Sequence, residues 1–215
     1  MDHHQVLSIE TPTHGRVLIE DPAESFSGRL LVGCHGYGQA ADTMLEQLQK
    51  IPGSNRWRLV SVQALSRFYT RSNEAVIASW MTRQDRESAI ADNIEYLNRA
   101  VTAAGADEAR TIVYLGFSQG ASMAARAATR GSHRAHGLIL LGGDIPPDVR
   151  DDSSLAIPPV LIGVGSRDDW YGARVDADIA FLKARSVPHE VVRFDGGHEF
   201  TDEFRQAVGK WLERI

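Results

Sequence analysis

The sequence of 215 residues predicts an α/β fold, with a mostly parallel central sheet and helices on both of its faces. Short apolar runs rich in β-branched residues alternate along the chain with longer segments whose apolar residues recur at helical spacing. Several runs are continuously apolar, as is typical of strands that are covered on both faces. The runs expected to form strands are residues 17–19, 30–34, 59–62, 111–117, 138–141, 160–164 and 191–194.

Another run, near residues 5–9, precedes the first of these strands. The Thr-Pro-Thr-His-Gly segment that follows it predicts an antiparallel hairpin at one edge of the sheet. Helices are expected between the later strands, including a small-residue helix over residues 121–129. The apolar stripes of the others are Met44, Leu45, Leu48 and Ile51; Ile90, Ile94, Leu97 and Val101; Val175, Ile179 and Leu182; and Phe200, Phe204, Val208, Trp211 and Ile215.

One domain is expected over residues 1–215, because the sequence contains no repeat, no low-complexity tract and no linker. The segment between the strands at 138–141 and 160–164 is too short for a helical lid domain, so we expect an open site. Residues 64–84 and 143–158 are the longest irregular segments. Both follow strands, where loops commonly carry function.

The composition favours a cytoplasmic protein without a nucleic-acid or membrane partner. The net charge is −5, whereas phosphate binding needs a basic face. No apolar run approaches the length of a membrane span, and the N-terminus lacks the basic and apolar segments of a signal peptide. The single cysteine, Cys34, excludes an internal disulfide. The sequence leaves the oligomeric state open.

Ser118 lies in the segment Gly116-Phe117-Ser118-Gln119-Gly120, between a predicted strand and a predicted helix. This segment fits the G-x-S-x-G pattern, in which the glycines make room for a nucleophile on a sharp strand-to-helix turn. The helix N-terminus also favours negative charge on a reacting oxygen. The same residues are compatible with a serine that only caps the helix, so the segment alone leaves both interpretations open.

A serine nucleophile needs a general base, and the base needs an acid that orients it. His198 follows two glycines just after the last predicted strand, at the same sheet edge as Ser118. The acid is expected after the preceding strand, where both Asp168 and Asp169 occur, and Asp144 is a third candidate. The chain shows no metal-ligand spacing, so we expect neither a metal nor another cofactor.

The oxyanion of a tetrahedral intermediate needs two backbone N–H donors. One is expected from Gln119, directly after the serine, and the other from Tyr37 in the loop Cys34-His35-Gly36-Tyr37-Gly38-Gln39. A plain glycine-rich turn is the alternative for this loop. Nucleotide binding is not expected, because the loop lacks the third glycine of the dinucleotide pattern and the Lys-Ser/Thr pair of a phosphate loop.

The segments HGYGQ, GFSQG, GSRDDWY and GGHEF follow one another in this order, and together they resemble the α/β-hydrolase family. Within it they are similar to the phospholipase/carboxylesterase group, which includes acyl-protein thioesterases. The resemblance covers about residues 28–215. In that group a Gly-x-x-Asp pattern carries the acid, which implies Asp168 rather than Asp169. A tryptophan after the fourth strand of the group implies that Trp80 lines the acyl pocket, with a core tryptophan as an equal alternative.

The expectation is therefore a carboxylic ester hydrolase that works through an acyl-enzyme on Ser118, with His198 as the base. Trp170 and Tyr171 are expected to contact substrate in an open site that favours small or accessible acyl esters. Thioesterase, amidase or perhydrolase activity at the same residues is an alternative. A non-catalytic ligand receptor on the same scaffold is another.

Overall fold

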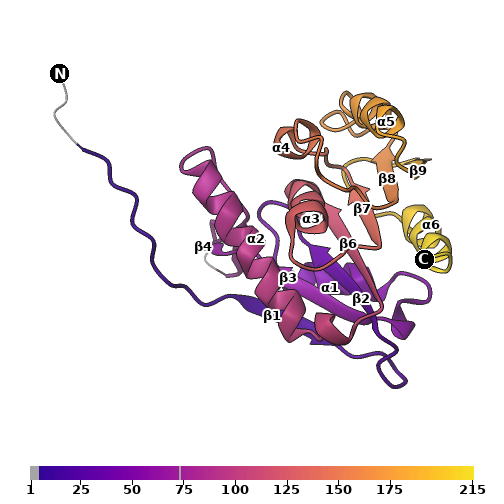
Figure 1. Ribbon diagram of the computed structural model, residues 1–215, viewed down its shortest axis with the longest axis horizontal. Coiled ribbons are helices and arrows are strands. Elements are labelled where there is room, and N and C mark those ends of the chain that lie inside the picture. The colour runs from indigo at the N-terminus through magenta and orange to yellow at the C-terminus, as the bar shows by residue number, and fades with distance from the viewer. Residues whose placement is uncertain (1–4, 73) are drawn as a thin grey trace.

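The computed structural model describes residues 5–72 and 74–215, in which strands and helices alternate (Figure 1). The strands are β1 (Arg16–Glu20), β2 (Arg29–Cys34), β3 (Arg58–Gln63), β4 (Ser66–Tyr69), β5 (Val76–Ser79), β6 (Thr111–Phe117), β7 (Gly137–Leu141), β8 (Val160–Gly165) and β9 (His189–Phe194). The α-helices are α1 (Ala41–Gln49), α2 (Arg86–Ala103), α3 (Gln119–Arg130), α4 (Pro147–Arg150), α5 (Val175–Ala184) and α6 (Asp202–Leu212). Short 3₁₀ helices, Ser54–Arg56 and Ala106–Glu108, precede β3 and β6.

The central sheet contains seven strands in the order β1-β3-β2-β6-β7-β8-β9. β1 runs antiparallel to β3, whereas every other neighbouring pair is parallel. The predicted mostly parallel sheet is therefore confirmed. Because parallel strands point their carboxyl ends the same way, the segments after β2, β6, β7, β8 and β9 meet at one edge of the sheet.

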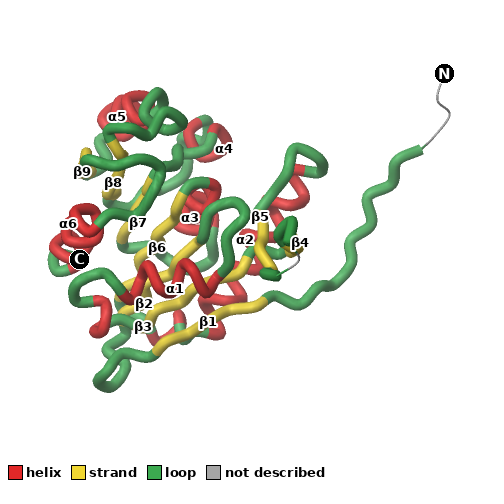
Figure 2. The backbone as a smooth tube through the Cα atoms, turned by 180° about the vertical axis from the view of Figure 1, so that it is seen from behind, coloured by secondary structure: helices red, strands yellow, loops and turns green. Residues whose placement is uncertain are grey.

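The continuously apolar strands supply side chains to two cores, one on each face of the sheet. In β6, Ile112 and Tyr114 belong to the core that α2, α3 and α5 cover. Val113, Leu115 and Phe117 belong to the core that α1 and α6 cover. Figures 1 and 2, seen from opposite sides, show α3 and α1 on opposite faces of the sheet. The predicted covering of both faces is confirmed.

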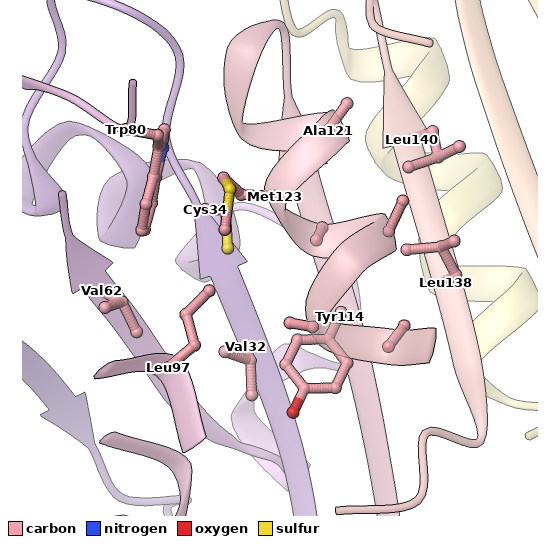
Figure 3. Close-up of a cluster of buried hydrophobic side chains, with 14 of the residues drawn as sticks. Val32, Cys34, Val62, Trp80, Leu97, Tyr114, Ala121, Met123, Leu138 and Leu140 are labelled. Carbon is pink, nitrogen blue, oxygen red and sulfur yellow. The ribbon is translucent and has the colours of Figure 1, made fainter. Parts of the chain in front are cut away.

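The core beneath α2 and α3 fixes the start of α3 over the end of β6 (Figure 3). Leu97 of α2 and Met123 of α3 pack against Val32 of β2 and Tyr114 of β6, and all four side chains are buried. Burying a large apolar side chain of this kind stabilises the fold by about 1.5–3 kcal/mol. The many alanines of α3 let its backbone lie close to the sheet, which matters for the residue directly before the helix.

Two expectations for the chain before α2 are wrong. Residues 5–15 form no strand and run away from the sheet, and β1 pairs with β3 instead of with a preceding strand (Figure 1). The apolar residues Val6, Leu7 and Ile9 are exposed there, so the segment buries too little surface to stabilise a hairpin. Within residues 64–84, which were expected to be irregular, β4 and β5 form a separate antiparallel pair.

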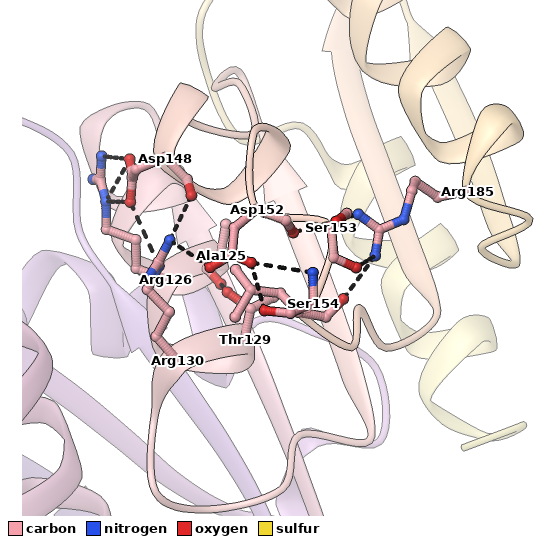
Figure 4. Close-up of polar contacts among 10 residues, drawn as sticks. Ala125, Arg126, Thr129, Arg130, Asp148, Asp152, Ser153, Ser154 and Arg185 are labelled. Atoms are coloured by element: carbon pink, nitrogen blue, oxygen red, sulfur yellow. Dashed lines mark hydrogen bonds and ion pairs between the residues drawn. The ribbon is translucent and has the colours of Figure 1, made fainter.

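The segment between β7 and β8 contains only the four-residue helix α4, which confirms that no large lid interrupts the sheet there. Ion pairs and hydrogen bonds hold this segment against its neighbours (Figure 4). The buried Arg126 of α3 donates to Asp148 at 2.6 Å, and Arg130 pairs with Asp152. Arg185 after α5 donates to the carbonyl oxygen of Leu155 at 2.8 Å. These contacts keep the loop after β7 in place beside α3.

None of the helices in the described part of the chain is long and apolar enough to cross a membrane.

Candidate active site

Ser118 occupies a strained turn between β6 and α3. Its φ of 55° and ψ of −120° are unusual for a residue other than glycine. A Cβ atom at Gly116 would lie 2.3 Å from the carbonyl oxygen of Gly120, and one at Gly120 would lie 2.1 Å from that of Cys34. Only glycine therefore fits at both positions while α3 stays close to the end of β2. The turn has the geometry that presents a nucleophile at the carboxyl edge of a sheet.

His198 and Asp168 form a direct contact at the same edge. The Nδ1 atom of His198 lies 2.8 Å from Oδ2 of Asp168, and the aspartate side chain is buried whereas the histidine side chain is 35% exposed. The other carboxylate oxygen of Asp168 accepts hydrogen bonds from the backbone N–H groups of Trp170 at 3.1 Å and Tyr171 at 2.9 Å. The loop after β8 therefore holds this carboxylate facing the imidazole.

The other two acid candidates lie elsewhere. Asp169 is exposed to solvent, and Asp144 lies on the wall of the cleft that contains Ser118. Asp168 is the aspartate that the structure brings against His198.

Packing places the imidazole beside the serine turn. The ring of His198 lies 4.9 Å from that of Phe117, the residue before Ser118. A Cβ atom at Gly142 would lie 2.9 Å from the His198 ring, and one at Gly143 would lie 2.4 Å from the carbonyl oxygen of Ser118. The histidine and the serine thus flank one glycine pair. No hydrogen bond joins His198 Nε2 to the Ser118 hydroxyl in the described part of the chain, a contact that often tightens only when substrate binds.

The loop after β2 uses the N–H groups on both sides of Tyr37 in internal hydrogen bonds. Gly36 N–H donates to the side chain of Gln39, Gly38 N–H donates to the carbonyl of Ala78, and Gln39 N–H donates to the carbonyl of Gly36. Among residues 5–72 and 74–215, the N–H of Tyr37 has no partner. Gln119 is the first residue of α3, so its N–H has no intrahelical partner either.

His35 supports this loop from beneath. It is fully buried, its Nε2 accepts the N–H of Ala64 at 3.0 Å, and its Nδ1 lies 2.7 Å from the carbonyl oxygen of Gly36. Burial lowers the pKa of His35, so the imidazole is neutral, with its proton on Nδ1 as these partners require. Sequence reasoning used His35 only as part of a tight turn and missed this supporting contact.

The side chain of Gln119 holds the end of β5 and the residues after it. Sequence reasoning considered only the backbone N–H of Gln119 and missed this role. Its Oε1 accepts the N–H of Trp80 at 2.9 Å and the hydroxyl of Ser79 at 3.2 Å, and its Nε2 donates to the carbonyl of Met81 at 2.8 Å. The residue after the serine therefore joins α3 to one wall of the cleft.

Trp80 and Tyr171, both expected to contact substrate, have fully buried side chains, which for Trp80 agrees with the alternative of a core tryptophan. Trp80 lies in the core with Cys34 and Met123 (Figure 3), and its Nε1 donates to the carbonyl of His35 at 2.8 Å. Tyr171 donates its hydroxyl proton to Asp178 at 2.9 Å, and burial raises its pKa. Trp170 is 48% exposed and lines the cleft, and its contact with substrate stays a prediction.

The cleft at Ser118 has a volume of 440 Å³ and is also lined by Tyr37, Gln119 and Trp170. A larger hollow of 510 Å³ lies beside Arg29 and Thr111, at the starts of β2 and β6. Ligands of open α/β sheets bind at the carboxyl ends of the strands, so the Ser118 cleft is the candidate active site. Cys34 is buried below it, and burial raises the pKa of its thiol, which disfavours a thiolate nucleophile.

The phospholipase/carboxylesterase family profile matches residues 16–214. The Bacillus cereus carboxylesterase structure is similar with a TM-score of 0.72 at 17% identity, over 93% of this chain and 94% of that one. The Mesorhizobium loti carboxylesterase structure is similar with a TM-score of 0.67 at 22% identity, over 88% of this chain and 90% of that one. The structure of Zea mays acyl-protein thioesterase 2 is similar with a TM-score of 0.70 at 19% identity, over 94% of this chain and 99% of that one.

No curated protein sequence matches the chain. The structural similarities confirm the expected α/β-hydrolase fold, and the family match is consistent with an esterase or thioesterase type of hydrolase. By its match over residues 16–214, the chain belongs to the phospholipase/carboxylesterase family.

Proposed function

We propose that the protein is a serine hydrolase that cleaves carboxylic esters through an acyl-enzyme, with Ser118, His198 and Asp168 as its catalytic residues. The observation that carries this proposal is the position of the His198–Asp168 pair, 2.8 Å apart, against Phe117 and the glycine pair beside the strained turn of Ser118. A nucleophile on a sharp turn, a base in reach of it and an acid that orients the base are what acyl transfer requires.

In the proposed reaction, Ser118 Oγ bonds to the acyl carbon while His198 Nε2 takes the hydroxyl proton. Asp168 keeps the other imidazole proton on Nδ1 and stabilises the cation that forms. The N–H groups of Tyr37 and Gln119 donate to the oxyanion. The bond to the alcohol then breaks, and the alcohol leaves with the proton from His198. In the second half of the reaction, His198 takes a proton from a water molecule while the water oxygen bonds to the acyl carbon. The bond to Ser118 Oγ then breaks, His198 returns the proton to this oxygen, and the acid is released.

The shape of the cleft favours small or accessible acyl groups. It is formed by loops at the sheet edge, and the segment between β7 and β8 adds only α4 above it. Esters and thioesters share the same chemistry at these residues, and the similar structures include carboxylesterases and an acyl-protein thioesterase. A panel of matched oxygen and sulfur esters, with acyl chains of increasing length, separates these substrates by kcat/KM. A strong preference for long chains would contradict the open cleft.

Labelling with a fluorophosphonate probe tests the nucleophile. The protein should be labelled, and Ser118→Ala should not be. Ser122→Ala removes another hydroxyl of the same cleft and should still be labelled. Peptide mass spectrometry identifies the modified serine. Labelling that persists in Ser118→Ala would overturn the proposal.

Turnover tests the alternative of a ligand receptor on the same scaffold. An enzyme releases many equivalents of alcohol from an activated acetate ester, whereas a receptor with a reactive serine releases one and stops. Release of a single equivalent in this assay would favour the receptor.

A further inference from the structure

Arginine side chains lie in and beside the cleft of Ser118. Arg83 and Arg86, from the end of the β5–α2 connection and the first residue of α2, line the same cleft as Ser118. A third guanidinium, that of Arg174, lies 4.4 Å from the ring centroid of Trp170, which also lines the cleft, and its Nη1 donates to the carbonyl of Trp170 at 2.9 Å. Two guanidinium groups therefore line the cleft of the reacting serine, and a third contacts a residue of its lining.

These guanidinium groups are not neutralised within the protein. None of the three forms an ion pair with a carboxylate in the described part of the chain, whereas most arginines elsewhere do, such as Arg99 with Glu95 and Arg214 with Glu190. The protein as a whole carries a net charge of −5, so its composition does not predict positive charge at this place.

One carboxylate opposes the two arginines of the cleft lining. It belongs to Asp144, which forms no ion pair with any residue of the described ranges. Two guanidinium groups against one carboxylate leave the lining positive, and the nearby Arg174 adds to this excess. A concave site lined by one sign of charge concentrates ligands of the other sign, and guanidinium groups bind carboxylate and phosphate oxygens in pairs of hydrogen bonds.

We infer that the protein prefers ester substrates that carry a carboxylate, which Arg83 and Arg86 bind while the ester carbonyl contacts Ser118. This inference rests on the proposed hydrolase function and specifies its substrate class. The charge belongs either to the acyl part or to the alcohol part of the ester, and matched substrates distinguish the two.

Two pairs of substrates make the test. 4-Nitrophenyl hexanoate and mono-4-nitrophenyl adipate differ by a carboxylate in place of the terminal methyl group of the acyl part. Phenyl acetate and 4-acetoxybenzoate differ by a carboxylate in the alcohol part. We expect kcat/KM to be higher for the charged member of at least one pair, by about tenfold, because charge-assisted hydrogen bonds contribute this much at an accessible site. The pair that shows the preference identifies the part that carries the charge.

The double variant Arg83→Gln/Arg86→Gln should lower the charged-to-neutral ratio of kcat/KM about tenfold, mainly through KM, and Arg83→Glu/Arg86→Glu should invert the preference. The preference should weaken as salt is raised, because exposed charges are screened. Arg99→Gln/Arg214→Gln is the matched control. It removes the same net charge at exposed positions away from the cleft and should keep the wild-type ratio.

The outcomes separate this inference from the function on which it rests. If neutral esters are cleaved in a Ser118-dependent way but neither pair shows a preference, the substrate class is wrong and the hydrolase stands. The same conclusion follows if Arg83→Gln/Arg86→Gln lowers kcat/KM equally for the charged and the neutral member of a pair. If none of the four esters is cleaved beyond the rate of Ser118→Ala, both proposals fail.

Discussion

The hydroxyl of Tyr171 donates a hydrogen bond of 2.9 Å to Asp178, a carboxylate that is completely buried. The backbone N–H of the same tyrosine donates to Asp168 at 2.9 Å. Asp178 also accepts the N–H of Ile145 at 3.2 Å and pairs with Arg150. One buried carboxylate therefore connects the loop after β8, which carries Asp168, with the loop after β7, which passes between His198 and Ser118.

Tyr171→Phe tests whether this connection positions Asp168. The change keeps the ring and removes one hydrogen bond, so we expect kcat to fall several-fold with little change in KM. The free energy of unfolding should fall by about 1–3 kcal/mol, because a buried carboxylate oxygen loses its donor. Steady-state kinetics and urea denaturation measure the two effects.

Tyr96→Phe is the matched control for this variant. Its hydroxyl donates a 2.9 Å hydrogen bond to the carbonyl of Arg16, in a part of the fold away from the cleft. It should lower stability without lowering kcat. Equal kcat in both variants would show that Tyr171 acts only on stability.

The buried Asp178 should also make the free energy of unfolding depend on pH. Burial raises its pKa to about 6, although the charge of Arg150 acts in the opposite direction. In the unfolded chain this carboxyl titrates near its ordinary value of about 4. Between these values the folded state binds more protons than the unfolded state, so the contribution of Asp178 is present at low pH and is lost as pH rises through about 6.

Asp178→Asn removes this titration. Urea denaturation at several pH values between about 4 and 7 should therefore show the stability of the wild type, relative to the variant, decreasing as pH rises, by an amount on the order of 2 kcal/mol. A difference that stays constant across this range would show that Asp178 titrates as an ordinary exposed carboxyl.

Asp168→Asn and Asp169→Asn separate the two adjacent acid candidates. Asn at 168 no longer stabilises the imidazolium and favours the wrong tautomer of His198, so kcat should fall by about 10³–10⁴. Asp169 is exposed, and its variant should stay within a few-fold of the wild type. Both variants replace an aspartate by an asparagine at adjacent positions. A similar loss of kcat in the two variants would therefore contradict the role proposed for Asp168.

Much of the fold follows from local patterns. The apolar run at 111–117 coincides with β6, and the stripe from Ile90 to Val101 lies within α2. Short polar-flanked segments were harder to interpret. The run at 5–9 has apolar residues but buries none of them, β4 is exposed along its whole length, and β5 has only the short apolar run from Val76 to Ala78. In both cases the outcome depends on which partner surface is available, and the local sequence does not contain that information.

The candidate site divides in the same way. The motifs of the sequence, which follow one another in chain order, indicated Ser118, Asp168 and His198. Parallel strands bring the loops that follow them to one edge whatever the detailed packing. The aromatic residues near them could not be assigned like this. Trp80 and Trp170 are both tryptophans that follow a strand. Trp80 is buried and donates to the carbonyl of His35, whereas Trp170 lines the cleft.

By itself, the sequence determined the strand and helix types, the doubly covered parallel sheet and the residues expected at its carboxyl edge, because hydrophobic periodicity and glycine-flanked turns are local properties. Only the tertiary structure decided that Tyr171 is buried against Asp178, that Trp80 lies in the core, and that Arg83 and Arg86 line the cleft without a carboxylate partner among the described residues. These depend on distances between segments far apart in the chain, which are set by the packing of both cores at once.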